Sequence, residues 1–156
     1  MTRRYAYSLG GSRAVDAAPL SKPKNTTILS SIQRDGALHY TTFSGGTTVE
    51  KFKTYLENDL LPYLNSDSVL IMDNMKSHHS KAVKELLNKA GVQYVYLPPY
   101  SPDLNPIEKL WSKVKALLRK FKARTLDALP DAIQRAFQVV TQPDCADWFR
   151  SCGYML

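Results

Sequence analysis

The chain has 156 residues, of which 44% are hydrophobic and 22% are charged, and its formal net charge is +7. This composition is typical of one globular domain and argues against a disordered, collagenous or coiled-coil protein. The apolar runs are far shorter than a membrane-spanning helix, and residues 1–4 lead into no hydrophobic signal sequence. We therefore expect neither a membrane partner nor export.

The first predicted elements are two strands joined by a tight turn. Residues 26–32 and 37–43 are β-rich runs, and Asp35-Gly36 between them is typical of a type I′ hairpin turn. An antiparallel pair is expected here.

A helix and a buried strand are predicted next. Thr47 and Glu50 have the spacing of a capping box, and Pro62 ends the segment that follows. The apolar run at 68–73 is typical of a strand buried on both faces, with Asp73 at its carboxyl end. The apolar residues of the helix share one face: Val49, Phe52, Leu56, Leu60 and Tyr63.

The following residues predict a βαβ unit. Ser77 is positioned to cap a helix that ends at Gly91, and residues 92–97 form the next strand, parallel to the previous one. Four prolines in residues 98–106 predict a stiff, extended connection. The helix is expected to bury Ala82, Val83, Leu86, Leu87 and Ala90.

Three helices complete the predicted fold. Asn105 caps the first, whose apolar face is Ile107, Leu110, Trp111, Val114, Leu117, Leu118 and Phe121. Thr125 caps the second, which turns Leu126, Leu129, Ile133, Phe137 and Val140 inward, with Pro130 disturbing its first turns. A short last helix with Trp148, Phe149 and Cys152 stops at Gly153. The elements predict a single mixed α/β domain over residues 1–156.

The two cysteines point to a reducing compartment. Cys145 and Cys152 are seven positions apart in the last helix, about 10 Å along its axis, which is too far for a disulfide. We therefore expect a cytoplasmic protein.

The positive charge is concentrated in two segments. Residues 106–124 hold seven basic residues against one acidic residue, and residues 1–24 hold five against one, whereas the rest of the chain is net negative. This asymmetry indicates a polyanionic partner. The alternative is that the lysines only form a solvated helix face.

Two carboxylates are candidates for chemistry. Asp73 ends a predicted buried strand, where open α/β sheets place their sites. Glu108 heads the basic helix on the same stripe as Ser112, Lys115, Arg119 and Lys122. This pattern suits a hard divalent cation held beside phosphates. The alternatives are that Asp73 is only a turn residue and Glu108 only a capping-box residue.

Other polar residues give weaker signals. His78 and His79 are adjacent, so they point to different sides of a helix and do not predict a zinc site. Tyr94, Tyr96 and Tyr100 are assigned to packing rather than to base stacking.

Two motifs carry a family resemblance. Residues 73–78 (DNMKSH) follow an apolar strand, and residues 97–108 (LPPYSPDLNPIE) are followed by Trp111. Together, with 34 residues between Asp73 and Glu108, they resemble the catalytic core of bacterial insertion-sequence transposases of the mariner superfamily. The resemblance implies a ribonuclease-H-like fold that cuts and joins DNA with three acids and two Mg²⁺ (or Mn²⁺) ions, with Asp73 as the second acid and Glu108 as the third.

The chain departs from the family pattern at its start. The first acid of the family lies on a first strand that Met1 leaves no room for. Asp16 falls in a turn-rich stretch and matches no family acid, and Asp35 makes the hairpin turn. We expect an N-terminally incomplete domain, with the first aspartate and a helix-turn-helix supplied by an upstream polypeptide or reading frame. A sheet lacking this strand is expected to leave unpaired backbone, which favours a homodimer.

The sequence thus predicts a metal-dependent DNA transposase fragment that works on transposon ends and target DNA in a bacterial cytoplasm, associated with the nucleoid. Asp73 and Glu108 are the expected catalytic and metal-binding residues. The rival hypothesis is a non-catalytic DNA-binding or assembly module derived from a transposase. The residues expected to bind DNA are Lys109, Lys113, Lys115, Arg119, Lys120, Lys122, Arg3 and Arg4.

Overall fold

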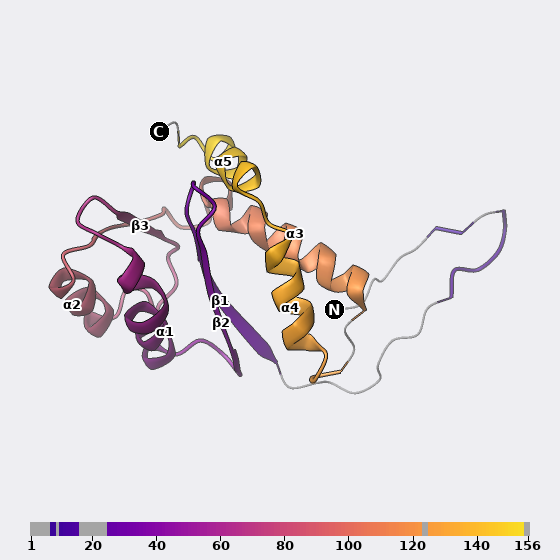
Figure 1. The fold of residues 1–156 in the computed structure, drawn as a ribbon, viewed down its shortest axis with the longest axis horizontal. Coiled ribbons are helices and arrows are strands. Elements are labelled where there is room, and N and C mark those ends of the chain that lie inside the picture. Colours follow the sequence, from indigo (N-terminus) through magenta and orange to yellow (C-terminus); the bar gives the residue numbers. More distant parts are fainter. Residues whose placement is uncertain (1–6, 9, 16–24, 123–124, 155–156) are drawn as a thin grey trace. The chain divides into compact units, whose positions relative to one another are not determined.

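The computed structural model describes residues 7–8, 10–15, 25–122 and 125–154, and it has a mixed α/β fold. Two compact units are present, one built from residues 24–109 and 141–156 and the other from residues 1–23 and 110–140. Figure 1 shows the helices and strands of both. The single domain over residues 1–156 stays a prediction. No helix among the described residues is long and apolar enough to cross a membrane.

The predicted hairpin is confirmed, but its turn is of another type. Strand β1 (Thr26–Ile32) pairs antiparallel with β2 (Leu38–Ser44), with Ile32 opposite Leu38. Gly36 donates its N–H to the carbonyl of Gln33, and φ is positive at Gly36 but not at Asp35. A type I′ turn requires positive φ at both, so the connection is instead a type I turn followed by a left-handed glycine.

Gly36 also allows a close approach between the hairpin and the last helix, α5 (Gln142–Ser151). A Cβ atom at Gly36 would lie 2.9 Å from Cβ of Gln142. The turn therefore needs glycine for its φ of 95° and for the space it leaves.

The first helix begins one residue later than predicted and ends irregularly. Thr48, not Thr47, accepts the N–H of Lys51 and caps α1 (Val49–Tyr55). A π-turn (Leu56–Leu60) and a 3₁₀ turn (Leu61–Tyr63) follow. These turns break the 3.6-residue period, so the predicted face does not continue to Tyr63, which is 62% exposed.

The predicted βαβ unit is confirmed. Strand β3 (Val69–Met72) pairs in parallel with β4 (Gln93–Tyr96), and α2 (Lys81–Lys89) connects them. The helix is capped by Ser80, whose Oγ accepts the N–H of Val83, and not by Ser77. Its buried face contains Val83 and Leu87, with Leu86 half-buried, whereas Ala82 and Ala90, which were expected to be buried, are exposed.

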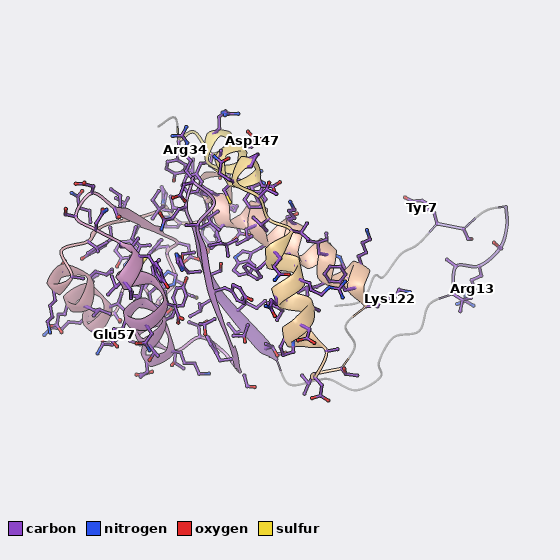
Figure 2. The ribbon with its side chains drawn as sticks, viewed as in Figure 1. Tyr7, Arg13, Arg34, Glu57, Lys122 and Asp147 are labelled. Atoms are coloured by element: carbon purple, nitrogen blue, oxygen red, sulfur yellow. The ribbon has the colours of Figure 1, made fainter. Side chains whose placement is uncertain are left out.

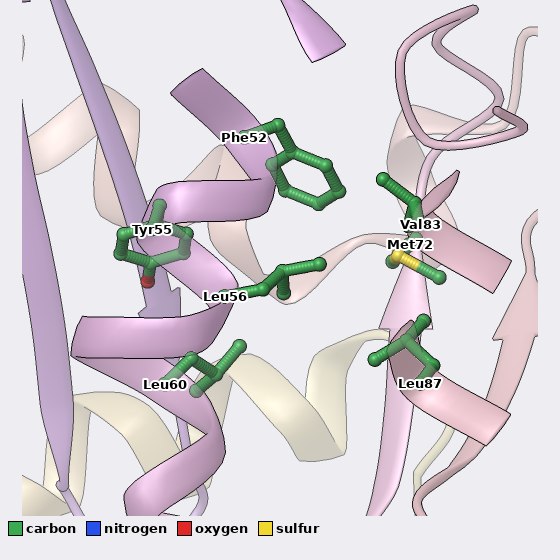
Figure 3. Close-up of a cluster of buried hydrophobic side chains, with 7 residues drawn as sticks. All are labelled: Phe52, Tyr55, Leu56, Leu60, Met72, Val83 and Leu87. Atoms are coloured by element: carbon green, nitrogen blue, oxygen red, sulfur yellow. The ribbon is translucent and has the colours of Figure 1, made fainter. Parts of the chain in front are cut away.

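The core of this unit lies on one side of the β3–β4 pair. Figure 3 shows its buried side chains, which come from α1, the π-turn, β3 and α2: Phe52, Tyr55, Leu56, Leu60, Met72, Val83 and Leu87. Leu70, Tyr94 and Tyr96 pack against them. Successive side chains of a strand point to opposite faces, so Val69 and Val95 remain 52% and 53% exposed. The expectation of a strand buried on both faces is therefore wrong.

The other unit contains most of α3 (Pro106–Phe121) and all of α4 (Leu129–Gln138). The predicted apolar face of α3 is confirmed, with Leu110, Val114 and Leu118 buried and Trp111 at 6.3 Å from Phe137 between ring centroids.

Helix α4 starts later than predicted. Its first residue is Leu129, so Pro130 falls in the first turn, where its missing N–H costs nothing. Leu126 precedes the helix and is exposed, whereas Ile133 and Phe137 are buried as predicted.

Helix α5 is fixed by a capping box between Thr141 and Asp144 that the sequence analysis did not identify. The predicted stop at Gly153, with φ of 89°, is confirmed. Cys145 and Cys152 are both buried, and they form no disulfide.

Tyr55 provides a test of the core. Its hydroxyl donates to Oγ of Ser31 at 2.9 Å or to the carbonyl of His39 at 3.1 Å, and burial raises its pKa to about 12. We expect Tyr55→Phe to lower the free energy of unfolding by about 1–3 kcal/mol, because buried acceptors lose their donor. Urea unfolding measures this, with the exposed Tyr63→Phe as the control. An unchanged value would contradict the assigned hydrogen bonds.

The raised pKa of Tyr55 also determines how the stability of the fold depends on pH. A tyrosine whose folded pKa exceeds its unfolded value of about 10 gives stability that is complete below pH 10 and is lost as the pH rises towards 12. This loss should be absent from Tyr55→Phe.

Candidate active site

Asp73 and Glu108 both follow the carboxyl end of the parallel strand pair. Asp73 comes directly after Met72, the last residue of β3, and Leu97 donates its N–H to the Met72 carbonyl at 2.8 Å beside it. The chain then runs from Leu97 through residues 98–105 into α3, whose first turn contains Glu108. Asp73 therefore lies at the carboxyl end of the β3–β4 pair, where open α/β sheets place their sites, and Glu108 follows the connection that leaves this end.

The connection to Glu108 is more folded than predicted. Residues Pro102–Leu104 form a 3₁₀ turn and Tyr100 has a φ of 57°, so the segment is not extended throughout. The hydroxyl of Tyr154, after α5, donates to the carbonyl of Leu104 at 2.9 Å. Glu108 donates its N–H to the carbonyl of Asn105, and its side chain is exposed. The start of α3 is thus anchored while the carboxylate stays accessible.

The carboxylate of Asp73 is held by two donors. Its Oδ1 atom accepts the N–H of Met75 at 3.0 Å and contacts Nδ1 of His78 at 2.8 Å. The hydrogen bond from His78 is the main reason that the pKa of Asp73 is lowered, with desolvation opposing it and the Met75 N–H adding to it. Asp73 is therefore ionised at neutral pH. The hydrogen bond from the Met75 N–H shows that Asp73 also stabilises the turn after β3, but the Asp73 side chain is still 52% exposed.

This donor set fits a hard divalent cation. Mg²⁺ and Mn²⁺ prefer oxygen ligands, and both acids offer accessible carboxylate oxygens. Both contacts of Asp73 use Oδ1, so within the described part of the chain Oδ2 is left for a ligand. In that same part, no three His, Cys, Asp or Glu side chains form a group that could hold a metal ion. Metal binding by Asp73 and Glu108 stays a prediction.

The sequence analysis missed the role of the histidines. His78 pairs with Asp73, whereas His79 contacts the side-chain oxygen of Asn74 and stacks on the ring of Tyr96 at 4.0 Å. The signal was the position of His78 inside the 73–78 motif. Ser77, predicted to cap a helix, is instead buried, with no hydrogen-bond partner for Oγ in the described residues.

The assignment of the three tyrosines to packing is confirmed for two of them. Tyr94 and Tyr96 pack against the core, but Tyr100 is fully exposed.

The basic residues of α3 lie on its solvent side. Lys109, Lys115 and Lys120 are exposed, and Lys113 and Arg119 are half-buried. Lys122, labelled in Figure 2, follows the helix with a φ of 51°, so it does not continue the helical stripe that the sequence predicted. Arg3, Arg4 and Arg124 lie outside the described residues. DNA binding by these side chains stays a prediction.

Comparison with known proteins shows which family shares these features. The sequence profile described as DDE superfamily endonuclease matches residues 1–130. The chain is similar to the Transposable element Tcb2 transposase of Caenorhabditis briggsae, with 33% identity over 93 residues, covering 57% of this chain and 34% of the relative. The Transposable element Tc1 transposase of Caenorhabditis elegans is 29% identical over 89 residues, covering 57% of this chain and 33% of the relative.

A solved structure shares the fold. It is described as the Mos1 mariner paired end complex with Mn, and it superposes with a TM-score of 0.78 at 20% sequence identity. The match covers 96% of this chain and 47% of that chain. This similarity confirms the predicted mixed α/β, ribonuclease-H-like fold. The chain spans about a third of the length of the two curated relatives.

Proposed function

Because this chain belongs to the DDE superfamily of endonucleases and is a Tc1/mariner-like transposase catalytic domain, we propose that it contributes to the cleavage and joining of transposon DNA with a divalent metal. The proposal is carried by the exposed Asp73 carboxylate directly after β3, and the exposed Glu108 carboxylate at the start of α3 supports it.

The two acids are proposed to hold Mg²⁺ or Mn²⁺. Such ions activate a water or a 3′-hydroxyl for in-line attack on phosphorus and stabilise the leaving oxygen. Asp73 suits this role because its lowered pKa keeps it charged at neutral pH. Tyr154 supports the segment that carries Glu108. The complex of Mos1 with Mn is consistent with this choice of metal.

The DNA is proposed to lie along the basic residues of α3. Exposed lysines bind the phosphate backbone without reading its sequence, and they release counterions as they do so. The similar Mos1 transposase is described in a paired-end complex with a left transposon end, which supports transposon ends as the DNA. We propose a homodimer because a sheet that lacks its first strand would leave backbone groups unpaired.

We also propose that this chain is one part of a transposase. The chain covers a minority of each curated relative's length, which supports an upstream segment that supplies the first aspartate and a helix-turn-helix. An origin in a bacterial insertion sequence, with action on nucleoid DNA, is proposed from the 73–78 and 97–108 motifs, and a cytoplasmic location is proposed from the spacing of the two cysteines. The two relatives named above come from nematodes.

The metal site can be tested by titrating the chain with Mn²⁺ in a calorimeter. We expect weak binding, with a dissociation constant of roughly 10⁻⁴–10⁻³ M, because two carboxylates give few ligand charges. Asp73→Asn and Glu108→Gln should each weaken it at least about tenfold, or about 1.4 kcal/mol. The control is Asp67→Asn, an exposed aspartate in the turn before β3.

Equal Mn²⁺ affinities for the wild type and the three variants would mean that Asp73 and Glu108 have structural roles only. That result, combined with intact DNA binding, would favour the rival hypothesis of a non-catalytic DNA-binding module.

A further inference from the structure

The side chain of His78 contacts both the backbone carbonyl and the carboxylate of Asp73. Its Nδ1 atom lies 2.8 Å from Oδ1 of Asp73 and 3.3 Å from the Asp73 carbonyl oxygen. Both of these atoms are acceptors, so Nδ1 must carry the proton and donate. The contact therefore fixes which nitrogen of the ring is protonated.

The imidazole ring is itself held in place. His78 is only 8% exposed, and its ring lies 4.2 Å from the ring of Phe52, a core residue of α1. Its backbone carbonyl accepts the hydroxyl of Tyr96, from β4, at 2.8 Å. A turn closed by its N–H and the carbonyl of Met75 completes its support. Contacts from a helix and a neighbouring strand thus determine where Nδ1 points.

We propose that His78 is the positioning residue of the metal site, and that it orients the Asp73 carboxylate through Nδ1–H so that Oδ2 is presented to the metal. The inference rests on the proposed function of Asp73. It assigns a different role to each oxygen of the carboxylate. Oδ1 accepts hydrogen bonds from His78 and Met75, and Oδ2 remains available. A carboxylate held on one oxygen cannot rotate away, so less freedom is lost when a cation binds.

The geometry allows a sharp choice of variants. In His78→Asn the amide nitrogen branches from Cγ, as Nδ1 does, so a donor to Asp73 is kept. In His78→Gln the amide lies one bond further out, near the position of Nε2, and the donor to Asp73 is lost. Both variants lose the ring that packs on Phe52, so both should lower the melting temperature by similar amounts.

The measurement is Mn²⁺ affinity by calorimetry, together with the melting temperature of each metal-free protein. We expect His78→Asn to stay within about twofold of the wild type and His78→Gln to bind about tenfold more weakly. The matched control is His39→Gln, which also removes a ring stack, between His39 and Tyr63 at 4.1 Å, but touches no part of Asp73. It should retain wild-type affinity.

Equal affinities for His78→Asn and His78→Gln would overturn the proposal, whether both match the wild type or both are weak. The outcome is separable from that of the proposed function. If Asp73→Asn weakens binding and His78→Gln does not, only the positioning role fails, whereas an unaffected Asp73→Asn removes the metal site itself.

Discussion

Cleavage of transposon-end DNA in Mg²⁺ is expected only when this chain is joined to an upstream strand that ends in an aspartate. Phosphoryl transfer depends on holding two cations in position, and without the first acid much of the negative charge that would hold one of them is missing. The assay is nicking of a plasmid that carries the terminal repeats of the encoding element, with the 156-residue chain and the extended chain compared at equal concentration.

The amide variants of the extended chain carry the largest expected effect. Asp73→Asn and Glu108→Gln keep the shape of each side chain but remove its charge, and each should reduce cleavage by roughly 10²–10³-fold or more. Asp67→Asn should cleave at the wild-type rate, since this exposed turn residue precedes β3 rather than following it. Robust cleavage by the 156-residue chain alone would mean that its metal site needs no upstream acid. Activity that survives both amide changes would contradict the two-metal proposal.

The second large effect is expected in DNA affinity. Changing Lys115, Arg119 and Lys122 together to Ala should reduce the slope of log affinity against log salt by about 2.7, because each phosphate contact contributes about 0.9. At 0.1 M salt this corresponds to a loss of affinity on the order of 10²–10³-fold. Alanine is a better helix former than lysine or arginine, so α3 should remain folded.

A matched set of lysines tests whether position matters or only total charge. Lys81, Lys84 and Lys89 belong to α2, and replacing them by Ala removes the same three charges from the net +7. Fluorescence anisotropy at several salt concentrations measures both variants. We expect the α2 variant to keep most of the wild-type slope. Equal losses in the two variants would show that α3 is a solvated face with no special role.

The features that repeat along the chain could be predicted from the sequence alone. Alternation and apolar runs located β1, β2, β3 and β4, and a 3.6-residue period located the buried face of α3. These patterns succeed because each element must bury one stripe or one face, whatever lies opposite. The motifs also placed Asp73 and Glu108 after parallel strands, since strand ends follow directly from strand assignments.

The contacts between segments that are distant in the sequence could be seen only in the tertiary structure. The hairpin turn leaves no room for a side chain at Gly36 because α5 approaches it there, and no pattern within residues 26–43 records this contact. The cap of α2 is Ser80 rather than the predicted Ser77, because the chain first folds back and brings His78 to Asp73.

The candidate site likewise combines a feature that is predictable from local sequence with one that depends on packing. Local sequence supplies a carboxylate at the end of β3, but its partner is chosen by packing, because Phe52 and Tyr96 come from α1 and β4 and fix the ring of His78. A histidine five residues after an aspartate is compatible with many geometries. Only the assembled core selects the one in which Nδ1 donates to the carboxylate, and that selection requires contacts between residues distant in the sequence.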